Sequence, residues 1–364
     1  MTTIKDIFNT YGPEYVQRFG DAMPNVHHKV INAIINCRTE YYGTMIYKCE
    51  KCGQSHIVFR SCGNRHCPNC QHHKTQLWIE KQMNRQLPGH HFMVTFTIPQ
   101  ELHSFIRSNQ RKCYSAMFKT SSKTLKKLSQ DEKYIGGDLP GFFGVLHTWG
   151  RMLQYHPHIH YIIPGGALSS QDDKWHPSRI DFYLPVKAMS KMFKAKFIDE
   201  MKKNGLYSKI PNNAWNKKWI VNCQAVGNGE QSIKYLAPYV FKVAISDSRI
   251  VKVENNKVFF KYKKSGSRRW RTTSLDVMEF IRRFLQHVLP TGFMKIRYYG
   301  FLHPNASVSL EKIAALIELT FGFKIVNQKK KVGPLKAPIC PDCGGKLIYF
   351  ASALPFRLIQ AQSG

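Results

Sequence analysis

Eight of the ten cysteines are gathered into two short stretches, and this clustering limits the possible folds more than any other feature of the sequence. Six cysteines lie between residues 37 and 70, and a further pair lies at Cys340 and Cys343. A secreted disulfide scaffold would spread its cysteines more evenly and carry a signal peptide, whereas the first ten residues here hold no apolar stretch. We therefore expect a reducing compartment, in which Cys-x-x-Cys turns bind metal.

The first stretch contains two Cys-x-x-Cys turns, which together can place four thiolates around one zinc ion. The predicted ligands of this zinc are Cys49, Cys52, Cys67 and Cys70. Four other side chains in or just before the intervening loop could hold a second zinc, namely Cys37, His56, Cys62 and His66. Because four protein ligands leave no position for water, we expect the module to be structural. The turn Cys340-Pro-Asp-Cys343 has no second pair after it and is only a weak indication of a metal site.

The chain carries a large excess of positive charge. Its 54 Lys and Arg residues against 23 Asp and Glu residues give a formal net charge of +31 and a pI near 9.8. The basic residues run through the whole chain instead of forming one tail, which favours nucleic acid as a polyanionic partner. No apolar run approaches the roughly 20 residues that cross a bilayer. We expect no membrane association and a cytoplasmic, nucleoid-associated protein.

Helix-like and strand-like patterns alternate along the middle of the chain. Strands are predicted at 91–98, 141–149, 158–163 and 219–226. Helices are predicted within 1–36, at 71–86, 100–129, 185–203 and 274–289, and from about residue 230 onward. A hairpin is predicted at 249–263, a basic loop at 265–269 and a linker at 327–338. The alternation indicates an α/β or α+β core with one central sheet.

Three histidines on two of the predicted strands form a candidate metal site. Side chains alternate along a strand, so His158 and His160 point to the same face. If the residues up to Pro157 turn the chain back, the strand that carries His147 pairs antiparallel with theirs and supplies a third imidazole. Three protein ligands leave positions open for water and substrate, as a catalytic metal requires. The alternative is that these are ordinary surface or core histidines.

Two tyrosines in the next predicted helix are candidate nucleophiles. Tyr235 and Tyr239 would share one face of a helix, and a phenol that has lost its proton can attack a phosphate. Pro238 lies between them, and proline is harmless only in the first turn of a helix. Either the helix begins near Lys234, or a kink changes the relative direction of the two phenols and leaves one of them catalytic. The alternative is two ordinary packing aromatics.

These motifs also occur in a specific order. The zinc turns precede His147-Thr-Trp-Gly, then the His-Pro-His-Ile-His run at 156–160, then Tyr235-x-x-x-Tyr239 with the segment 240–250. From about Cys37 to about Pro304 the sequence in this way resembles the rolling-circle transposases of the insertion-sequence 91 family. These are HUH endonucleases with two tyrosines and an N-terminal zinc-binding domain.

The resemblance implies an α+β fold, in which a small helical and zinc-ribbon-like domain precedes a central antiparallel HUH-type sheet flanked by helices. It implies four consecutive regions: a helical and zinc-binding domain at 1–88, a catalytic domain at 89–264, a C-terminal helical DNA-binding region at 265–335, and a knuckle-like tail at 336–364.

The resemblance further implies that a tyrosine attacks one DNA strand at the end of the element, forms a 5′-phosphotyrosine and releases a 3′-OH. By motif, Tyr235 and Tyr239 are then the nucleophiles, and His158 and His160 are ligands of Mg²⁺ or Mn²⁺. His147 as third ligand rests on the strand argument and on the general HUH pattern of two plus one. The expected partner is single-stranded DNA at element ends and target site. The basic residues expected to bind it are Arg65, Lys234, Lys242, Arg249, Arg268 and Arg269.

Two other functions remain open from the residues. A plasmid replication initiator or a conjugative relaxase would use the same chemistry, although the N-terminal zinc module favours a transposase. A non-catalytic zinc-dependent DNA-binding protein would keep the cysteines without needing the histidines or tyrosines. The sequence makes no prediction of the oligomeric state.

Overall fold

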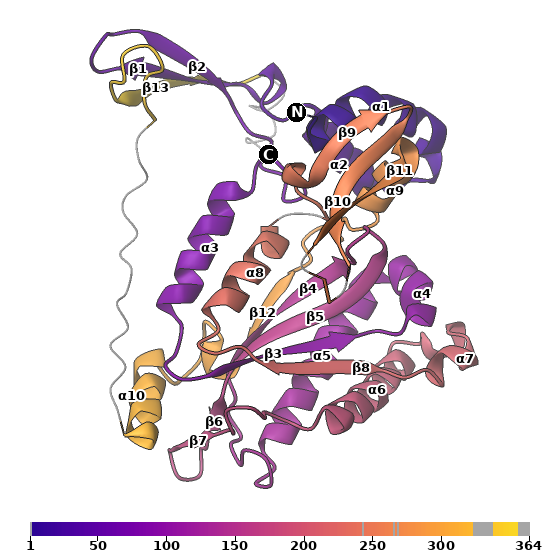
Figure 1. Cartoon of the computed structure of the whole chain (residues 1–364), viewed down its shortest axis with the longest axis vertical. Helices are drawn as coiled ribbons and strands as arrows, with labels where there is room; N and C mark the ends of the chain where they lie inside the picture. The colour runs from indigo at the N-terminus through magenta and orange to yellow at the C-terminus, as the bar shows by residue number, and fades with distance from the viewer. Residues whose placement is uncertain (1, 242–243, 265, 268, 323–337, 356–364) are drawn as a thin grey trace. The chain divides into compact units, whose positions relative to one another are not determined.

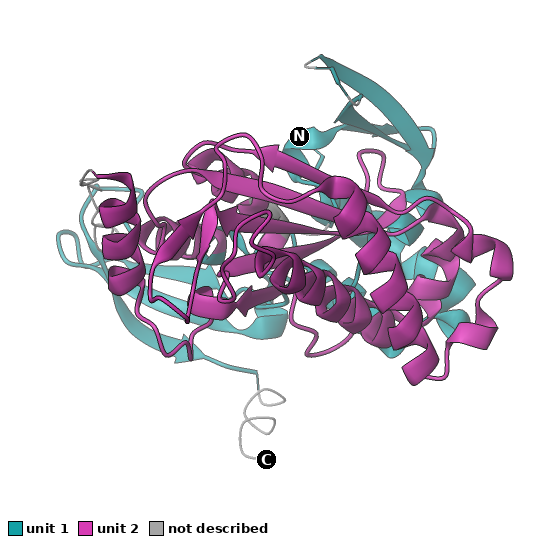
Figure 2. Ribbon diagram, turned by 90° about the horizontal axis from the view of Figure 1, so that it is seen from below, with its two compact units in different colours: residues 1–74, 241–288, 330–364 teal, residues 75–240, 289–329 magenta. Residues whose placement is uncertain are grey.

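The computed structural model describes residues 2–241, 244–264, 266–267, 269–322 and 338–355. The chain divides into two compact units, and each is built from separate stretches of sequence (Figure 2). Unit 1 comprises Met1–Lys74, Phe241–Val288 and Lys330–Gly364, and unit 2 comprises Thr75–Val240 and Leu289–Lys329. The first and last described stretches of the chain therefore both belong to unit 1, and the four consecutive regions suggested by the sequence stay a prediction.

Unit 2 is organised around a five-stranded sheet in which every neighbouring pair is antiparallel. The strands, in spatial order, are β12 (Ile296–Tyr299), β4 (Phe142–Trp149), β5 (Tyr155–Pro164), β3 (His91–Thr97) and β8 (Ile220–Ala225). The predicted α+β class with a central antiparallel sheet is confirmed.

One face of this sheet is apolar and packs on two long helices (Figure 1). Alternate residues of β3, among them Phe92 and Phe96, are fully buried against α5 (Gln110–Ser129) and α6 (Val186–Lys203). The apolar residues of α6 recur every four positions, which places them on one helical face. Phe193 of α6 meets Phe96 edge-on with ring centroids 5.0 Å apart. This packing fixes the direction in which the alternate residues of each strand point.

The opposite face of the sheet carries the polar residues and receives two other helices, α3 (His72–Asn84) and α8 (Glu230–Phe241) (Figure 1). Trp78 of α3 lies edge-on to Phe143 of β4 with ring centroids 5.8 Å apart. Phe143 and His147 have the same parity on β4 and so lie on the same face. The sheet therefore has one apolar face that packs on helices and one face whose polar side chains can form a functional site.

Shorter elements complete unit 2. They are η3 (Gln100–Leu102), α4 (His103–Ser108), β6 (Gly166–Leu168), β7 (Trp175–Pro177), η4 (Tyr207–Lys209), α7 (Asn212–Trp215), η6 (Gly300–Leu302) and α10 (Leu310–Phe321). The strands β6 and β7 form a separate antiparallel pair.

Within its described residues, unit 1 contains three helices and two small antiparallel sheets. The helices are α1 (Ile4–Phe19), α2 (Asn25–Ile35) and α9 (Val277–Leu285), with short 3-10 turns η1 (Gly20–Ala22), η2 (Glu40–Tyr42) and η5 (Asp247–Arg249). One sheet has the order β11 (Trp270–Asp276), β10 (Lys257–Lys263), β9 (Ile250–Glu254). The other has the order β13 (Leu347–Ala353), β1 (Thr44–Cys49), β2 (Ser55–Phe59). Phe8 of α1 packs edge-on against Phe284 of α9.

Several sequence predictions need correction. The hairpin at 249–263 gains a third strand, β11, and this strand occupies the first residues of the helix predicted at 274–289, which begins only at Val277. The side chain of Asp276 accepts the N–H groups of the first helical turn and so marks that start. The region 265–335 is thus not purely helical, since it also supplies β12 to the central sheet. Within the described residues, we find no helix with the length and hydropathy needed to span a bilayer.

Candidate active site and metal centres

Three histidines of the central sheet lie together on its polar face. His147 of β4 stands directly opposite His158 of β5, and His160 lies two residues further along β5. The ring centroids are 4.5 Å apart for His147 and His160, 4.8 Å for His158 and His160, and 5.1 Å for His147 and His158. One ring nitrogen of each histidine lies within 4.8 Å of the others. The antiparallel ladder expected from the sequence therefore brings the three imidazoles to one point.

Hydrogen bonds orient two of these rings. His158 Nδ1 lies 2.7 Å from the carbonyl oxygen of His156. A carbonyl can only accept, so Nδ1 carries the proton and Nε2 keeps the lone pair that a metal would need. His160 Nδ1 lies 2.8 Å from the hydroxyl of Thr95, which is its direct neighbour across the β3–β5 ladder. Such partners are typical of histidines that bind a metal through the other nitrogen.

Burial keeps the cluster uncharged. Desolvation lowers the pKa of His147 and of His158 well below the ordinary value, and the neighbouring imidazoles lower both further. Desolvation also lowers the pKa of His160 to about 4. All three rings are therefore neutral near pH 7, which is the form that binds metal.

The residues fit a divalent metal ion. Three neutral imidazoles converge, and hydrogen bonds fix two of the rings. Because all three histidines belong to one face of the sheet, they would bind the ion from one side and leave coordination positions open on the other. Imidazole ligands favour Mn²⁺ over the harder Mg²⁺.

The helix α8 carries the predicted nucleophiles beside this cluster. Tyr235 is 49% exposed, and its ring is perpendicular to that of His160 with the centroids 6.3 Å apart. Tyr239 follows one turn later on the helical backbone, and its side chain lies outside the described atoms. The helix begins at Glu230, so Pro238 lies well past the first turn and removes the backbone hydrogen bond to the carbonyl of Lys234. The first of the two alternatives posed by the sequence, a helix starting near Lys234, is therefore wrong.

Two residues near the histidines escaped the sequence prediction. Thr95 holds His160, as described above. Lys295 precedes β12, and its ammonium lies 4.6 Å from the ring centroid of Trp149, which stacks on His147. Thr95 could have been found from strand alternation, because Thr95 and Thr97 point to the same face of a strand that the sequence predicts at 91–98. Lys295 could not, since the short strand β12 after it was not predicted.

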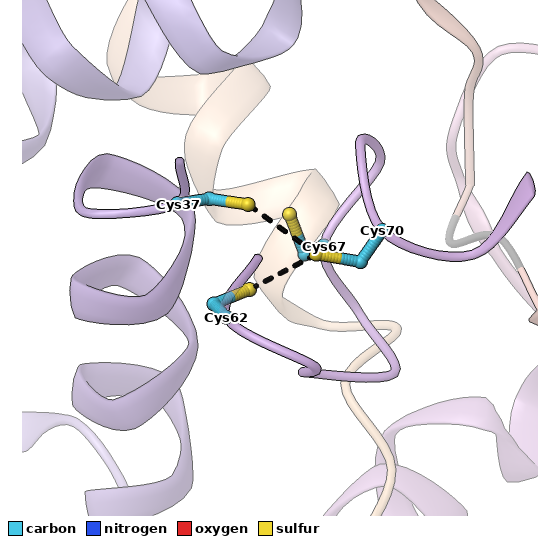
Figure 3. Close-up of side chains that lie close together, drawn as sticks. All are labelled: Cys37, Cys62, Cys67 and Cys70. Carbon is cyan, nitrogen blue, oxygen red and sulfur yellow. Dashed lines mark hydrogen bonds between the residues drawn. The ribbon is translucent and has the colours of Figure 1, made fainter. Parts of the chain in front are cut away.

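Four cysteines of unit 1 converge in a first cluster that could hold a metal ion, shown in Figure 3: Cys37, Cys62, Cys67 and Cys70. The sulfur of Cys70 lies 3.3 Å from that of Cys37 and 3.4 Å from that of Cys62. Cys37 directly follows the C-cap of α2, and the other three lie in the loop between β2 and α3. Hydrogen bonding within the cluster, above all with Cys37, lowers the pKa of the Cys70 thiol well below its ordinary value.

The remaining clustered cysteines form a second cluster made of Cys49, Cys52, Cys340 and Cys343. The predicted grouping of Cys49 and Cys52 with Cys67 and Cys70 is therefore corrected: each Cys-x-x-Cys turn of the first stretch belongs to a different cluster. The physical reason is that β13 pairs with β1. This pairing brings the turn Cys340–Cys343, just before β13, next to the turn Cys49–Cys52 at the end of β1.

The two histidines predicted as zinc ligands are also separated. His56 lies 3.2 Å through Nε2 from the sulfur of Cys340, in the second cluster and not beside Cys37 and Cys62. His66 is buried but belongs to neither group of four. No disulfide occurs among the cysteines of the described residues.

Four of the six basic residues predicted to bind DNA are described: Arg65, Lys234, Arg249 and Arg269. Lys242 and Arg268 lie outside the described residues. Lys234 is the one of the four that lies in unit 2, where it is exposed and pairs with Glu230 one turn earlier in α8. Arg269 is exposed, whereas Arg65 is half-buried beside the first cysteine cluster and burial lowers its pKa.

Comparison with known proteins gives the family. The family model described as a transposase zinc-binding domain matches residues 7–98, and one described as a putative transposase matches residues 141–309. A putative transposase of Sinorhizobium fredii is 34% identical over 320 residues, which cover 82% of this chain and 80% of that protein. The chain belongs to the insertion-sequence 91 family of transposases.

A second relative supports this assignment. The transposase for insertion sequence element IS801 of Pseudomonas savastanoi pv. phaseolicola is 25% identical over 355 residues, which cover 90% of this chain and 84% of that protein. No solved structure matches the chain. As a transposase of this family, the chain is a DNA-binding and DNA-cleaving enzyme, and it contains a zinc-binding domain.

Proposed function

We propose that this transposase cuts single-stranded DNA by attack of a tyrosine of α8 on a phosphodiester beside the His147, His158 and His160 cluster, as the first step of rolling-circle transposition. The observation that carries the proposal is the position of Tyr235. Its half-exposed ring lies 6.3 Å from that of His160, so an accessible phenol stands next to three convergent imidazoles. A nucleophile and a metal-binding group on one sheet face are what this chemistry requires.

The three histidines would hold Mn²⁺ or Mg²⁺, which neutralises charge on the phosphate oxygens and polarises the phosphorus when it is bound. The protein's own contribution is to keep the imidazoles neutral by burial and to fix His158 and His160 through the His156 carbonyl and the Thr95 hydroxyl. Because these partners are set before DNA arrives, little reorganisation accompanies the reaction.

In the cutting step the phenol loses its proton, and the phenolate oxygen forms a bond to phosphorus. The bond from phosphorus to the 3′-oxygen breaks, and that oxygen takes up a proton to become the free 3′-OH. The 5′ end remains esterified to the tyrosine. A later strand with a 3′-OH can reverse the step and restore a phosphodiester, so the bond energy is kept for rejoining.

Lys295 supplies a positive charge near this site. Its ammonium lies over Trp149, which in turn stacks on His147, so a phosphate that reaches the histidines also meets a fixed positive charge. Combined with a half-exposed aromatic side chain, Tyr235, this arrangement suits a single strand whose bases stack on rings and whose phosphates meet cations.

We further propose that Cys37, Cys62, Cys67 and Cys70 ligate the structural zinc of the zinc-binding domain. Tetrahedral zinc with thiolate bonds of about 2.3 Å sets sulfurs roughly 3.8 Å apart, and the sulfur of Cys70 lies 3.3 Å from that of Cys37 and 3.4 Å from that of Cys62. A modest expansion of the cluster would accommodate the ion.

The test is covalent trapping on single-stranded DNA from an element end, with Mn²⁺, followed by denaturing electrophoresis and mass spectrometry of the linked peptide. We expect an SDS-resistant adduct in the wild type, and its loss in the Tyr235→Phe, Tyr239→Phe double variant. The single variants report how the two tyrosines divide the work. Tyr207→Phe is the matched control and should retain the adduct, because Tyr207 lies in η4 and stacks on Trp215 of α7. An adduct in the double variant would refute the proposal.

A further inference from the structure

We propose that Cys49, Cys52, Cys340 and Cys343 form a second structural zinc site, which fastens the C-terminal segment of the chain to the zinc-binding domain. Cys49 and Cys343 are 294 residues apart in the sequence, and the C-terminal pair lies outside both family matches, 7–98 and 141–309. The inference concerns unit 1 alone and does not depend on the tyrosine chemistry.

The sulfur positions are those of a four-thiolate site. Cys49 Sγ lies 3.4 Å from Cys343 Sγ, and Cys52 Sγ lies 3.9 Å from Cys340 Sγ. All four sulfurs lie within 4.8 Å of one another. These separations bracket the roughly 3.8 Å between sulfurs around tetrahedral zinc. They are also far longer than a disulfide bond of about 2.0 Å.

The two turns share one local conformation. Each has the sequence Cys-x-x-Cys-Gly, and the glycines Gly53 and Gly344 have φ values of 73° and 68°, which other residues rarely adopt. In each turn the glycine N–H donates to the carbonyl of the first cysteine, at 3.0 Å in both cases. Because the two turns have the same conformation and face each other, each directs its two sulfurs toward the same metal position.

Backbone pairing brings the turns together. The strand β13 runs antiparallel to β1, and the register ends with Cys49 opposite Leu347. Just beyond it, the N–H of Glu50 donates to the carbonyl of Lys346 at 3.0 Å. At Gly345 a Cβ atom would come within 2.8 Å of Cys49 Sγ, so the close approach of the two turns requires glycine there.

His56 adds a hydrogen bond to the cluster and not a fifth ligand. Its Nε2 lies 3.2 Å from Cys340 Sγ, a suitable distance for an N–H group donating to sulfur. Four thiolates around one Zn²⁺ leave two negative charges, and donors from the second layer offset such charge. His56 is therefore a positioning residue for Cys340.

The small hydrophobic core of the β13–β1–β2 sheet also favours a bound metal. The buried cluster at this sheet consists of Cys49, Cys340 and Leu347, with Tyr47 and Cys343 packed against it. Ile57 and Phe350 on the same three strands are 65% and 62% exposed. A sheet with so small a core needs another source of stability, and small zinc modules obtain it from the metal.

The first experiment is zinc content of the full chain, measured by inductively coupled plasma mass spectrometry after purification without chelator. We expect the Cys340→Ser, Cys343→Ser double variant to lose one zinc per chain relative to wild type, and Cys343→His, which keeps a ligand, to retain it. Cys223→Ser is the matched control, since Cys223 lies in β8 outside both clusters, and it should keep the wild-type content. Unchanged zinc content in the double variant would overturn the proposal.

A second measurement uses the wild-type chain, so it tests the proposal even if the cysteine variants fail to fold. We expect the peptide with Cys340 and Cys343 to resist N-ethylmaleimide in the zinc-loaded protein, and to be alkylated at least tenfold faster after a chelator removes the metal. Equal alkylation rates with and without chelator, or a Cys49–Cys343 disulfide in protein kept under reductant, would refute the second zinc. Both measurements read out metal and thiols, so they are independent of whether the tyrosine adduct forms.

Discussion

Replacing Thr95 by valine should weaken divalent-metal binding at the histidine cluster. The Thr95 hydroxyl lies 2.8 Å from His160 Nδ1, and His160 is only 8% exposed. Valine keeps the shape of threonine but removes the hydroxyl, so His160 would lose both its orientation and its polar partner. Leaving one buried polar group without its partner costs about 1–3 kcal/mol, or roughly 5- to 150-fold in an equilibrium constant. Loss of such supporting partners in metal sites typically costs about 10- to 100-fold in affinity.

We therefore expect Thr95→Val to bind Mn²⁺ about 10- to 100-fold more weakly than wild type. The measurement is a titration of the zinc-loaded chain with Mn²⁺, with the free ion followed by electron paramagnetic resonance. The same variant should need about 10- to 100-fold more Mn²⁺ for half-maximal adduct formation, with the rate recovering at high metal.

Thr97→Val is the matched control for this prediction. Thr97 lies on the same strand and face as Thr95 and stands opposite His158, but His158 Nδ1 is held by the His156 carbonyl. Its replacement should change Mn²⁺ affinity less than threefold. If the two variants weaken binding equally, or if Thr95→Val binds as wild type does, the argument that Thr95 fixes His160 is wrong.

Three further predictions concern DNA contact, acid stability and packing. Lys295→Gln should raise the KM for single-stranded DNA and reduce the slope of log affinity against log salt by about 1, because one phosphate contact is lost; an unchanged slope would remove Lys295 from the DNA path. His91 is buried, and desolvation lowers its pKa from 6.5 to about 4. The unfolded chain therefore binds a proton first, and stability should fall as the pH drops from 6.5 to 4, by about 3 kcal/mol at most, with His91→Leu flattening this part of a urea-unfolding profile. The hydroxyl of Ser121 lies 2.6 Å from that of the fully buried Tyr161, which also hydrogen-bonds Tyr299. Ser121→Ala should therefore cost about 0.5–1.5 kcal/mol in the same assay, the net contribution of one hydrogen bond, and an unchanged stability would show that this bond does not stabilise the fold.

The clustering of the three histidines could be predicted from the sequence because the residues are close together along the chain. His158 and His160 differ by two residues, so strand alternation alone places them on one face. His147 is only eleven residues before His158, and a tight reversal between two strands can pair them only antiparallel. Neither step requires knowledge of the rest of the fold.

The sequence suggests the tyrosines as nucleophiles, a role that stays a prediction, but it could not predict their position. Helical spacing relates Tyr235 to Tyr239, yet no local pattern says over which face of the sheet their helix packs. That choice follows from the apolar layer: α5 and α6 cover one face, so α8 can lie only on the face that carries the histidines. The start of α8 at Glu230 likewise depends on the turn before it, where Asn228 Oδ1 accepts the N–H of Glu230.

The cysteines show where local reasoning fails. Spacing correctly indicated that the Cys-x-x-Cys turns would bring sulfurs together in pairs, because that is set within four residues. It could not indicate which pair faces which, because a turn specifies a direction and not a partner. The partner of Cys49 and Cys52 is decided by β13, a strand of seven residues with few buried side chains, which pairs with β1 through backbone hydrogen bonds that any sequence can make. Side-chain patterns therefore suggest the chemistry proposed for this protein, and backbone pairing between distant segments decides which cysteines come together.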